Sequence, residues 1–137
     1  MKKTVKLPEN FFLGAAASAW QTEGWSEKKE SQDSYIDLWY KENKNVWHNG
    51  YGPAVATDYY HRYKEDIAYM KEIGMNCYRT SLNWSRFLTD YENIVVDEEY
   101  ANYYDKMLDE LIAQGIEPMV CCLLYTSDAA DDMQCVD

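Results

Sequence analysis

The sequence lacks any run of about 18 apolar residues, the length that a membrane-spanning helix needs, although 47% of its 137 residues are hydrophobic. The lysines near the N-terminus have no apolar segment behind them, so no secretory signal is expected. Basic residues are also few: 13 Lys and Arg face 24 Asp and Glu, which gives a net charge of -11. Because nucleic acids and anionic membranes bind basic patches, neither is expected as a partner.

Metal-binding and disulfide patterns are missing too. The four cysteines include no pair at CxxC spacing, and the adjacent Cys121 and Cys122 make a poor disulfide framework. Reduced thiols in the cytoplasm are the simplest interpretation. His48 and His61 have no Cys, Asp or Glu nearby at the spacing of a metal site, so they are interpreted as solvated or core histidines. No metal or organic cofactor is predicted.

Aromatic residues are abundant, at 15% of the chain with 13 Tyr and 5 Trp. Aromatic side chains build cores first and sugar-stacking platforms second, so they are only a weak hint of carbohydrate binding. One stretch combines apolar, tiny and polar residues: Phe11–Ala16 predicts a strand, and Gln21 and Glu23 follow it at the start of a long polar loop, 21–34. In parallel α/β proteins ligands bind where strands hand over to such loops. A core strand followed by a plain polar turn is the alternative.

Two later segments repeat one pattern. Apolar residues at helical spacing run from about Thr57 to Gly74, and the strand-like segment 75–82 follows. Asp97 is then a predicted N-cap for a second amphipathic helix, which ends at Gly115 before the strand-like segment 116–121. Helix, glycine and short apolar strand, twice over, predict βα units with a parallel sheet.

A doubly wound sheet and a (β/α)8 barrel both fit this order of elements. A dinucleotide-binding sheet would need a GxGxxG turn, and the sequence has none. A complete (β/α)8 barrel takes about 250 residues. The sequence therefore predicts either a small α/β sandwich or the first three strands of an incomplete TIM barrel.

Four ordered blocks carry a family resemblance. The stretch from Gly14 to Gly24, with Gln21 near its end, resembles the N-terminal signature of glycoside hydrolase family 1, the β-glucosidase and phospho-β-glycosidase family. Segments 56–66, 78–86 and 115–118 are similar to the family's first barrel helix, second strand and approach to the third strand. The resemblance departs from the usual pattern at Leu13 and Trp20, which are not reacting groups. It implies an incomplete (β/α)8 barrel over residues 1–121.

The resemblance implies a retaining β-glycosidase. The sequence of residues 20–24, together with the long segment 35–53, is most similar to the 6-phospho-β-glucosidase branch of the family. Retaining enzymes use two carboxyl groups about 5–5.5 Å apart, one as nucleophile and one as acid/base. In the family these are glutamates on the fourth and seventh strands. None of Glu23, Glu65 or Asp66 matches them. The 137-residue chain is therefore predicted to be inactive by itself, within a cytoplasmic enzyme of carbohydrate metabolism.

Two site residues follow from the resemblance. Gln21 matches the glutamine that hydrogen-bonds hydroxyls of the bound sugar, for which an amide offers both donors and an acceptor. Arg79 matches the arginine that supports the nucleophilic carboxylate, and inside a barrel it would need a buried partner. Trp84 and Arg86 match positions interpreted as structural. A non-catalytic sugar-binding or interaction module remains the alternative function, with a β-glycoside or phospho-β-glycoside as the small-molecule partner of the parent enzyme.

The last segment departs from the family pattern. From Cys122 the sequence reads CLLYTSDAADD, and its back-translation resembles the end of a transposon sequencing adapter. Residues 122–137 are therefore predicted to be a non-native tail of translated adapter, and a divergent natural tail is the alternative. Resequencing of the source locus distinguishes the two.

Overall fold

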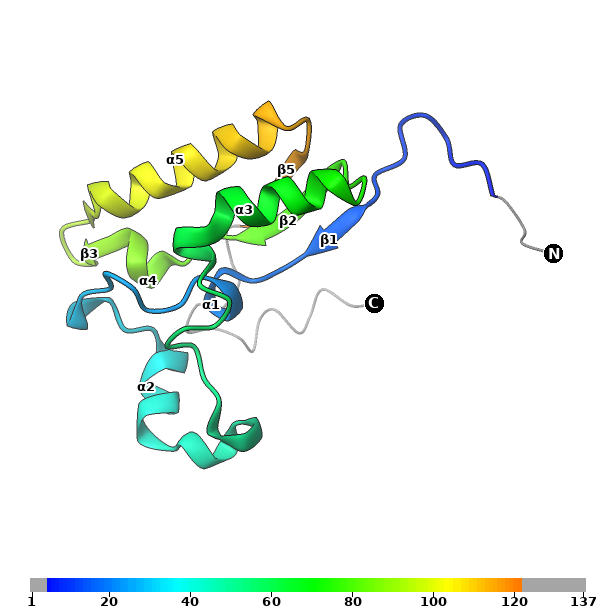
Figure 1. Ribbon diagram of the computed structural model, residues 1–137. Coiled ribbons are helices and arrows are strands. Elements are labelled where there is room, and N and C mark those ends of the chain that lie inside the picture. The colour runs from blue at the N-terminus through cyan, green and yellow to red at the C-terminus, as the bar shows by residue number, and fades with distance from the viewer. Residues whose placement is uncertain (1–4, 122–137) are drawn as a thin grey trace, which may run out of the picture.

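The computed structural model describes residues 5–121, and its centre is a three-stranded parallel sheet (Figure 1). The strands are β1 (Gly14–Ala16), β2 (Cys77–Ser81) and β5 (Glu117–Cys121). They lie side by side in chain order, so β2 pairs with both neighbours. The predicted parallel sheet is confirmed, and the predicted tail at 122–137 lies outside the described residues.

Two helices connect these strands and lie together along the sheet (Figure 1). They are α3 (Tyr59–Glu72) and α5 (Glu98–Ala113), each followed by a glycine with positive φ, Gly74 at +85° and Gly115 at +71°. The described part is therefore an open α/β piece with successive βα units and no closed barrel. Within it, β1 and β5 each pair along one edge only.

The start of α5 shows how local sequence sets an element. The Asp97 carboxylate accepts a hydrogen bond from the Tyr100 backbone N–H at 3.3 Å, and Glu98 and Glu99 occupy the first turn. Acidic groups in the first turn interact favourably with the helix dipole. The predicted N-cap at Asp97 is confirmed.

The core between helices and sheet is rich in tyrosine. Ile67 of α3 and Leu111 of α5 are fully buried and pack in one cluster with Tyr78 of β2. Six further tyrosines complete this layer: Tyr59, Tyr60, Tyr63, Tyr100, Tyr103 and Tyr104. Tyrosine fills volume like phenylalanine, but a buried hydroxyl usually takes a hydrogen-bond partner. Within the described residues the Tyr100 and Tyr104 hydroxyls have acceptors, whereas those of Tyr59 and Tyr103 have no hydrogen-bond partner.

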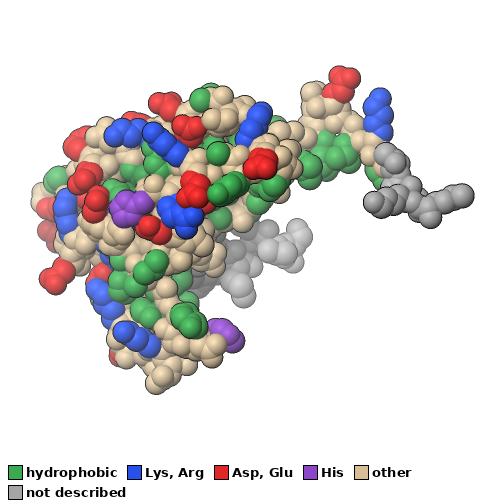
Figure 2. Space-filling view, in the orientation of Figure 1, with side chains coloured by type: hydrophobic (Ala, Val, Ile, Leu, Met, Phe, Trp, Pro, Cys, Tyr) green, Lys and Arg blue, Asp and Glu red, His purple; other side chains and the backbone are tan. Residues whose placement is uncertain are grey.

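The N-terminal third differs most from expectation. The predicted strand 11–16 is shortened to β1, and Phe11, Phe12 and Leu13 lie before it and are exposed. Figure 2 shows hydrophobic side chains along this extended N-terminal segment, whereas acidic and basic side chains dominate the face over α3. The prediction of a continuous loop from Gln21 to Ser34 is wrong. The chain forms the short helix α1 (Ala19–Thr22) there because Ser18 and Ala19 carbonyl groups accept backbone hydrogen bonds.

Between α1 and α3 the chain makes an excursion away from the sheet (Figure 1). It contains α2 (Tyr35–Glu42) and 3-10 turns at Glu30–Gln32, Lys44–Val46 and His48–Gly50. Between β2 and α5 lie α4 (Trp84–Phe87) and a hairpin of β3 (Leu88–Asp90) and β4 (Val95–Val96). None of the helices between residues 5 and 121 is long and apolar enough to cross a bilayer.

Candidate active site at the C-terminal ends of the strands

Gln21 lies on α1, immediately beyond the carboxyl end of β1. The Ala17 N–H donates to the Arg79 carbonyl oxygen at 2.8 Å, which extends the pairing of β1 with β2. The Ala19 N–H then donates to the Ser81 hydroxyl at 3.0 Å, so the last residue of β2 holds the first residue of α1. The Gln21 side chain is exposed at this end of the sheet. This is the end at which (β/α)8 barrels bind their substrates.

Arg79 lies at the middle of β2, opposite Ala16 on one side and Met119 on the other. It is exposed, whereas its strand neighbours Tyr78 and Thr80 are buried towards the helices. Side chains alternate along a strand, so Arg79 shares a face with Ser81, which holds α1. Arg79 therefore lies on the Ser81 face of β2, and Gln21 follows the carboxyl end of the neighbouring strand β1. Within residues 5–121 no ion pair reaches the Arg79 guanidinium, and its role stays a prediction.

Glu23 is the residue that sequence reasoning passed over. It ends α1 and is only 2% exposed. Its carboxyl oxygens accept hydrogen bonds from the Tyr100 hydroxyl at 2.5 Å and the Tyr104 hydroxyl at 2.7 Å. Burial raises the pKa of Glu23, and the two hydroxyls with Arg86 offset only part of that effect. Tyrosines at i and i+4 on a core stripe were the available signal, because their hydroxyls need an acceptor.

Arg86 of α4 holds the chain that follows Glu23. Its guanidinium lies 4.5 Å from the ring centre of Tyr60 and 4.6 Å from that of Tyr100. It donates to the Ser26 carbonyl oxygen at 2.6 Å and, more weakly, to that of Gly24 at 3.4 Å. Two aromatic faces and two carbonyl oxygens thus accommodate a cation that is 2% exposed. The sequence-based interpretation of Arg86 as structural agrees with this packing.

Gly24 fits the same turn for steric reasons. Its φ is +81°, and a Cβ built there would lie 2.7 Å from the Val55 carbonyl oxygen. Only glycine adopts that conformation without cost while leaving room for the neighbouring backbone. The predicted run from Gln21 to Gly24 therefore combines an exposed amide, a buried carboxyl group and a tight turn.

The excursion beside this end is held by Asp37 of α2, which is 1% exposed. Both indole N–H groups of Trp20 and Trp25 donate to its Oδ1, at 2.9 and 2.8 Å. Its Oδ2 accepts from Lys28 at 2.6 Å and from the Ser34 N–H and hydroxyl. Burial acts to raise the pKa of Asp37, but Lys28 and Ser34 outweigh it and hold the pKa below its ordinary value. One carboxylate therefore ties α1 to the excursion.

We expect Asp37→Asn to lower the free energy of unfolding by about 2–3 kcal/mol at pH 7, because it removes the charge that Lys28 and the indoles face. A carboxylate whose pKa is depressed in the folded state stabilises the fold above its unfolded pKa, and this stabilisation is lost as pH falls. The wild-type chain should therefore lose stability below about pH 4, and the variant should lose less. Urea unfolding at pH 7 and pH 3 measures both effects. Asp109→Asn, on the exposed face of α5, is the matched control. If Asp37→Asn lost as much stability between pH 7 and pH 3 as the wild type, Asp37 would not be the source of the pH dependence.

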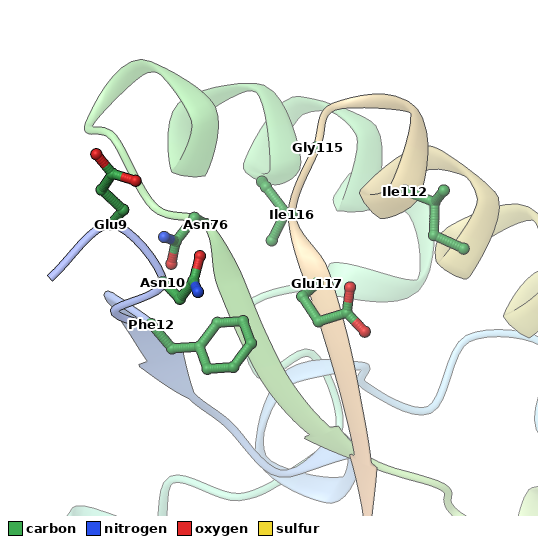
Figure 3. A pocket seen from close by; sticks show the side chains of 8 residues that line it. All are labelled: Glu9, Asn10, Phe12, Asn76, Ile112, Gly115, Ile116 and Glu117. Carbon is green, nitrogen blue, oxygen red and sulfur yellow. The ribbon is translucent and has the colours of Figure 1, made fainter.

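A hollow of about 470 Å³ lies at the other end of the sheet (Figure 3). Glu9, Asn10, Phe12 and Asn76 lie close together on one side of it, and Ile116 and Glu117 lie on the other (Figure 3). Asn76 precedes β2 and Glu117 begins β5, so the hollow faces the amino ends of the strands. Conserved chemistry in barrel enzymes lies at the opposite end. This hollow is therefore not the candidate active site.

Neither histidine adds a site. His61 Nδ1 lies 2.8 Å from the Asp58 carboxylate on the exposed side of α3. His48 contacts only the Asn49 amide among the hydrogen bonds of the described part. No group of three or more potential metal ligands occurs within residues 5–121.

Comparison with known proteins places this geometry in a family. The sequence model of glycosyl hydrolase family 1 matches residues 3–130. The matched interval includes Gln21, Glu23, Arg79 and Arg86, and it runs past residue 121 into the predicted tail. The nature of that tail stays a prediction.

Curated relatives agree with the family match. The 6-phospho-β-glucosidase GmuD of Bacillus subtilis is 37% identical over 115 residues, which cover 84% of this chain and 24% of that protein. β-Glucosidase 24 of rice, Oryza sativa subsp. japonica, is 38% identical over 130 residues, which cover 94% of this chain and 26% of that protein. The chain thus spans about a quarter of the length of the relatives it matches.

Solved structures give the same result. The psychrophilic β-glucosidase BglU of Micrococcus antarcticus superposes with a TM-score of 0.78 at 30% identity, over 93% of this chain and 27% of that one. The rice Os3BGlu6 β-glucosidase superposes with a TM-score of 0.74 at 35% identity, over 92% of this chain and 26% of that one. The described fold is therefore the N-terminal portion of a (β/α)8 barrel, and the chain belongs to glycosyl hydrolase family 1.

Proposed function

We propose that this chain is the N-terminal part of a retaining β-glycosidase that hydrolyses O-glycosyl bonds. The observation that carries the proposal is the family match over residues 3–130, which includes both predicted site residues. The fold supports it, because Gln21 follows the carboxyl end of β1 and Arg79 lies exposed on the neighbouring strand β2. In the complete enzyme, Gln21 binds hydroxyls of the sugar and Arg79 holds the nucleophilic carboxylate ionised and oriented. Neither role requires a metal or an organic cofactor.

We further propose that the sugar is a 6-phospho-β-glucoside and that the enzyme works in the cytoplasm. The support is the similarity to GmuD, which is a 6-phospho-β-glucosidase. The comparable identity to rice β-glucosidase 24 supports an unphosphorylated β-glucoside as the second candidate substrate. The residues that would bind the 6-phosphate belong, by resemblance, to parts of the barrel beyond this chain.

The test compares the 137-residue chain with the complete enzyme encoded at the source locus. We expect the chain to release no aryl alcohol from aryl 6-phospho-β-glucosides, because it lacks both catalytic glutamates. The complete enzyme should hydrolyse these substrates faster than the unphosphorylated glucosides. Turnover by the purified chain would contradict the first expectation, and a preference for free glucosides would contradict the second. A native gene that ends near residue 137 would overturn the enzyme assignment.

A further inference from the structure

Gln21 and Glu23 lie on opposite sides of one helical turn. A residue pair at i and i+2 is separated by about 200° around an α-helix. Glu23 retains helical backbone angles, with φ -73° and ψ -33°, so this relation extends to the end of α1. Gln21 is exposed and Glu23 is buried. The direction in which Gln21 points is therefore fixed by whatever holds Glu23.

Glu23 belongs to a set of contacts that joins α5, β2 and α1. Tyr100 and Tyr104 of α5 donate to its two carboxyl oxygens. The Tyr104 hydroxyl also lies 2.9 Å from the Ser81 carbonyl oxygen at the end of β2. Ser81 in turn accepts from the Ala19 N–H at the start of α1. Both ends of α1 are thus attached to β2, one directly and one through α5.

We propose that Glu23 is a positioning residue for sugar binding, which fixes the rotation of α1 and so directs the Gln21 amide towards the substrate. This inference rests on the proposed function of Gln21. Glu23 itself does not touch the sugar, because its carboxyl group is enclosed by Tyr100, Tyr104 and the nearby Arg86. Short helices of one turn have little stability of their own. The orientation of α1 therefore depends on these side-chain contacts.

The number of protons in the cluster determines which substitute can replace Glu23. The single Tyr104 hydroxyl proton lies within reach of two acceptors, Glu23 Oε1 at 2.7 Å and the Ser81 carbonyl oxygen at 2.9 Å. If the side chain at position 23 carries one more proton, it can donate to the Tyr104 hydroxyl oxygen. The Tyr104 hydroxyl can then donate to the Ser81 carbonyl oxygen while Tyr100 still donates to residue 23, so all three short contacts are hydrogen bonds. A glutamine amide supplies such a donor and retains an acceptor for Tyr100. The change removes the carboxylate charge that lies 4.0 Å from Arg86 Nη1, beyond hydrogen-bond distance, while Arg86 keeps its donations to the Ser26 and Gly24 carbonyl oxygens.

The kinetic test uses the complete enzyme and a series of monodeoxy aryl β-glycosides. Gln21→Ala should lose discrimination against the deoxy sugar that lacks the hydroxyl bound by Gln21. Glu23→Ala should lose the same discrimination and lower kcat/KM by about 10²-fold, the effect of a displaced binding group. Glu23→Gln should restore both. A uniform loss on every substrate in Glu23→Ala, or no rescue by glutamine, would overturn the positioning role.

A second measurement does not depend on activity. In Glu23→Ala, hydrogen exchange should accelerate at the backbone amides of positions 19 and 23, whereas the amides of α3 and α5 should stay protected. Glu23→Gln should exchange like the wild type. Unchanged exchange at α1 would contradict the anchoring. If the complete enzyme hydrolyses no β-glycoside, the proposed function fails and the role in sugar binding fails with it. If Gln21→Ala alone shows the selective loss, the function stands and only the positioning role fails.

Discussion

Arg86→Ala is expected to lower the free energy of unfolding of the chain by about 3–4 kcal/mol, because the guanidinium is 2% exposed and all its contacts are lost. The variant removes the cation that lies against both the Tyr60 and the Tyr100 ring. It also leaves the partly buried Ser26 carbonyl oxygen without its 2.6 Å donor. Leaving such an acceptor unsatisfied costs more than an average hydrogen bond contributes. Urea unfolding, followed by circular dichroism, measures the loss.

The chain offers a matched control in Arg62. Arg62 lies on the exposed side of α3 and pairs with Glu65 at 2.9 Å, one helical turn away. Exposed ion pairs are screened by solvent and contribute little to stability. Arg62→Ala should therefore unfold at nearly the wild-type urea concentration. Equal effects of the two substitutions would show that the packing of Arg86 against the two tyrosine rings does not stabilise the fold.

Gln21→Ala is expected to lower kcat/KM of the complete enzyme by about 10²–10³-fold, the usual result of removing one hydrogen-bonding group from the transition state. The stability of the protein should change little, because the Gln21 side chain is exposed. Steady-state kinetics on an aryl β-glycoside and a thermal melt separate the two effects.

Gln114→Ala is the control for this substitution. Gln114 follows α5 at the other end of the barrel segment, where its amide donates to Glu110. It should retain wild-type kinetics. The assignment of Gln21 to sugar binding would be contradicted if Gln114→Ala lost as much kcat/KM as Gln21→Ala. It would also be contradicted if Gln21→Ala kept the wild-type kcat/KM.

The regular parts of this fold could be predicted from the sequence because each carries its own signal. Apolar spacing indicated α3 and α5, and Gly74 and Gly115 marked their ends. Asp97 indicated the N-cap of α5 through a local hydrogen bond. These signals act over a few residues, so they can be seen without the rest of the chain.

The N-terminal third could not be predicted in the same way, because long-range contacts determine it. Asp37 collects indole, ammonium and hydroxyl donors from positions 20 to 34, and no periodic pattern reveals that set. Glu23 finds its partners 77 and 81 residues later in the sequence. The resemblance indicated Gln21, for which we propose a role in sugar binding, but not Glu23, whose hydrogen bonds in the described part of the chain are all internal.

The order of the strands has a consequence for how the chain folds. Each strand of the sheet pairs with the next one along the chain, β1 with β2 and β2 with β5. The partners of Glu23, Tyr100 and Tyr104, likewise precede β5 in the sequence. Proteins fold from the N-terminal side during synthesis at about 5–20 residues per second. The contacts that we propose to orient Gln21 therefore need no residue beyond this chain, so they can form during synthesis.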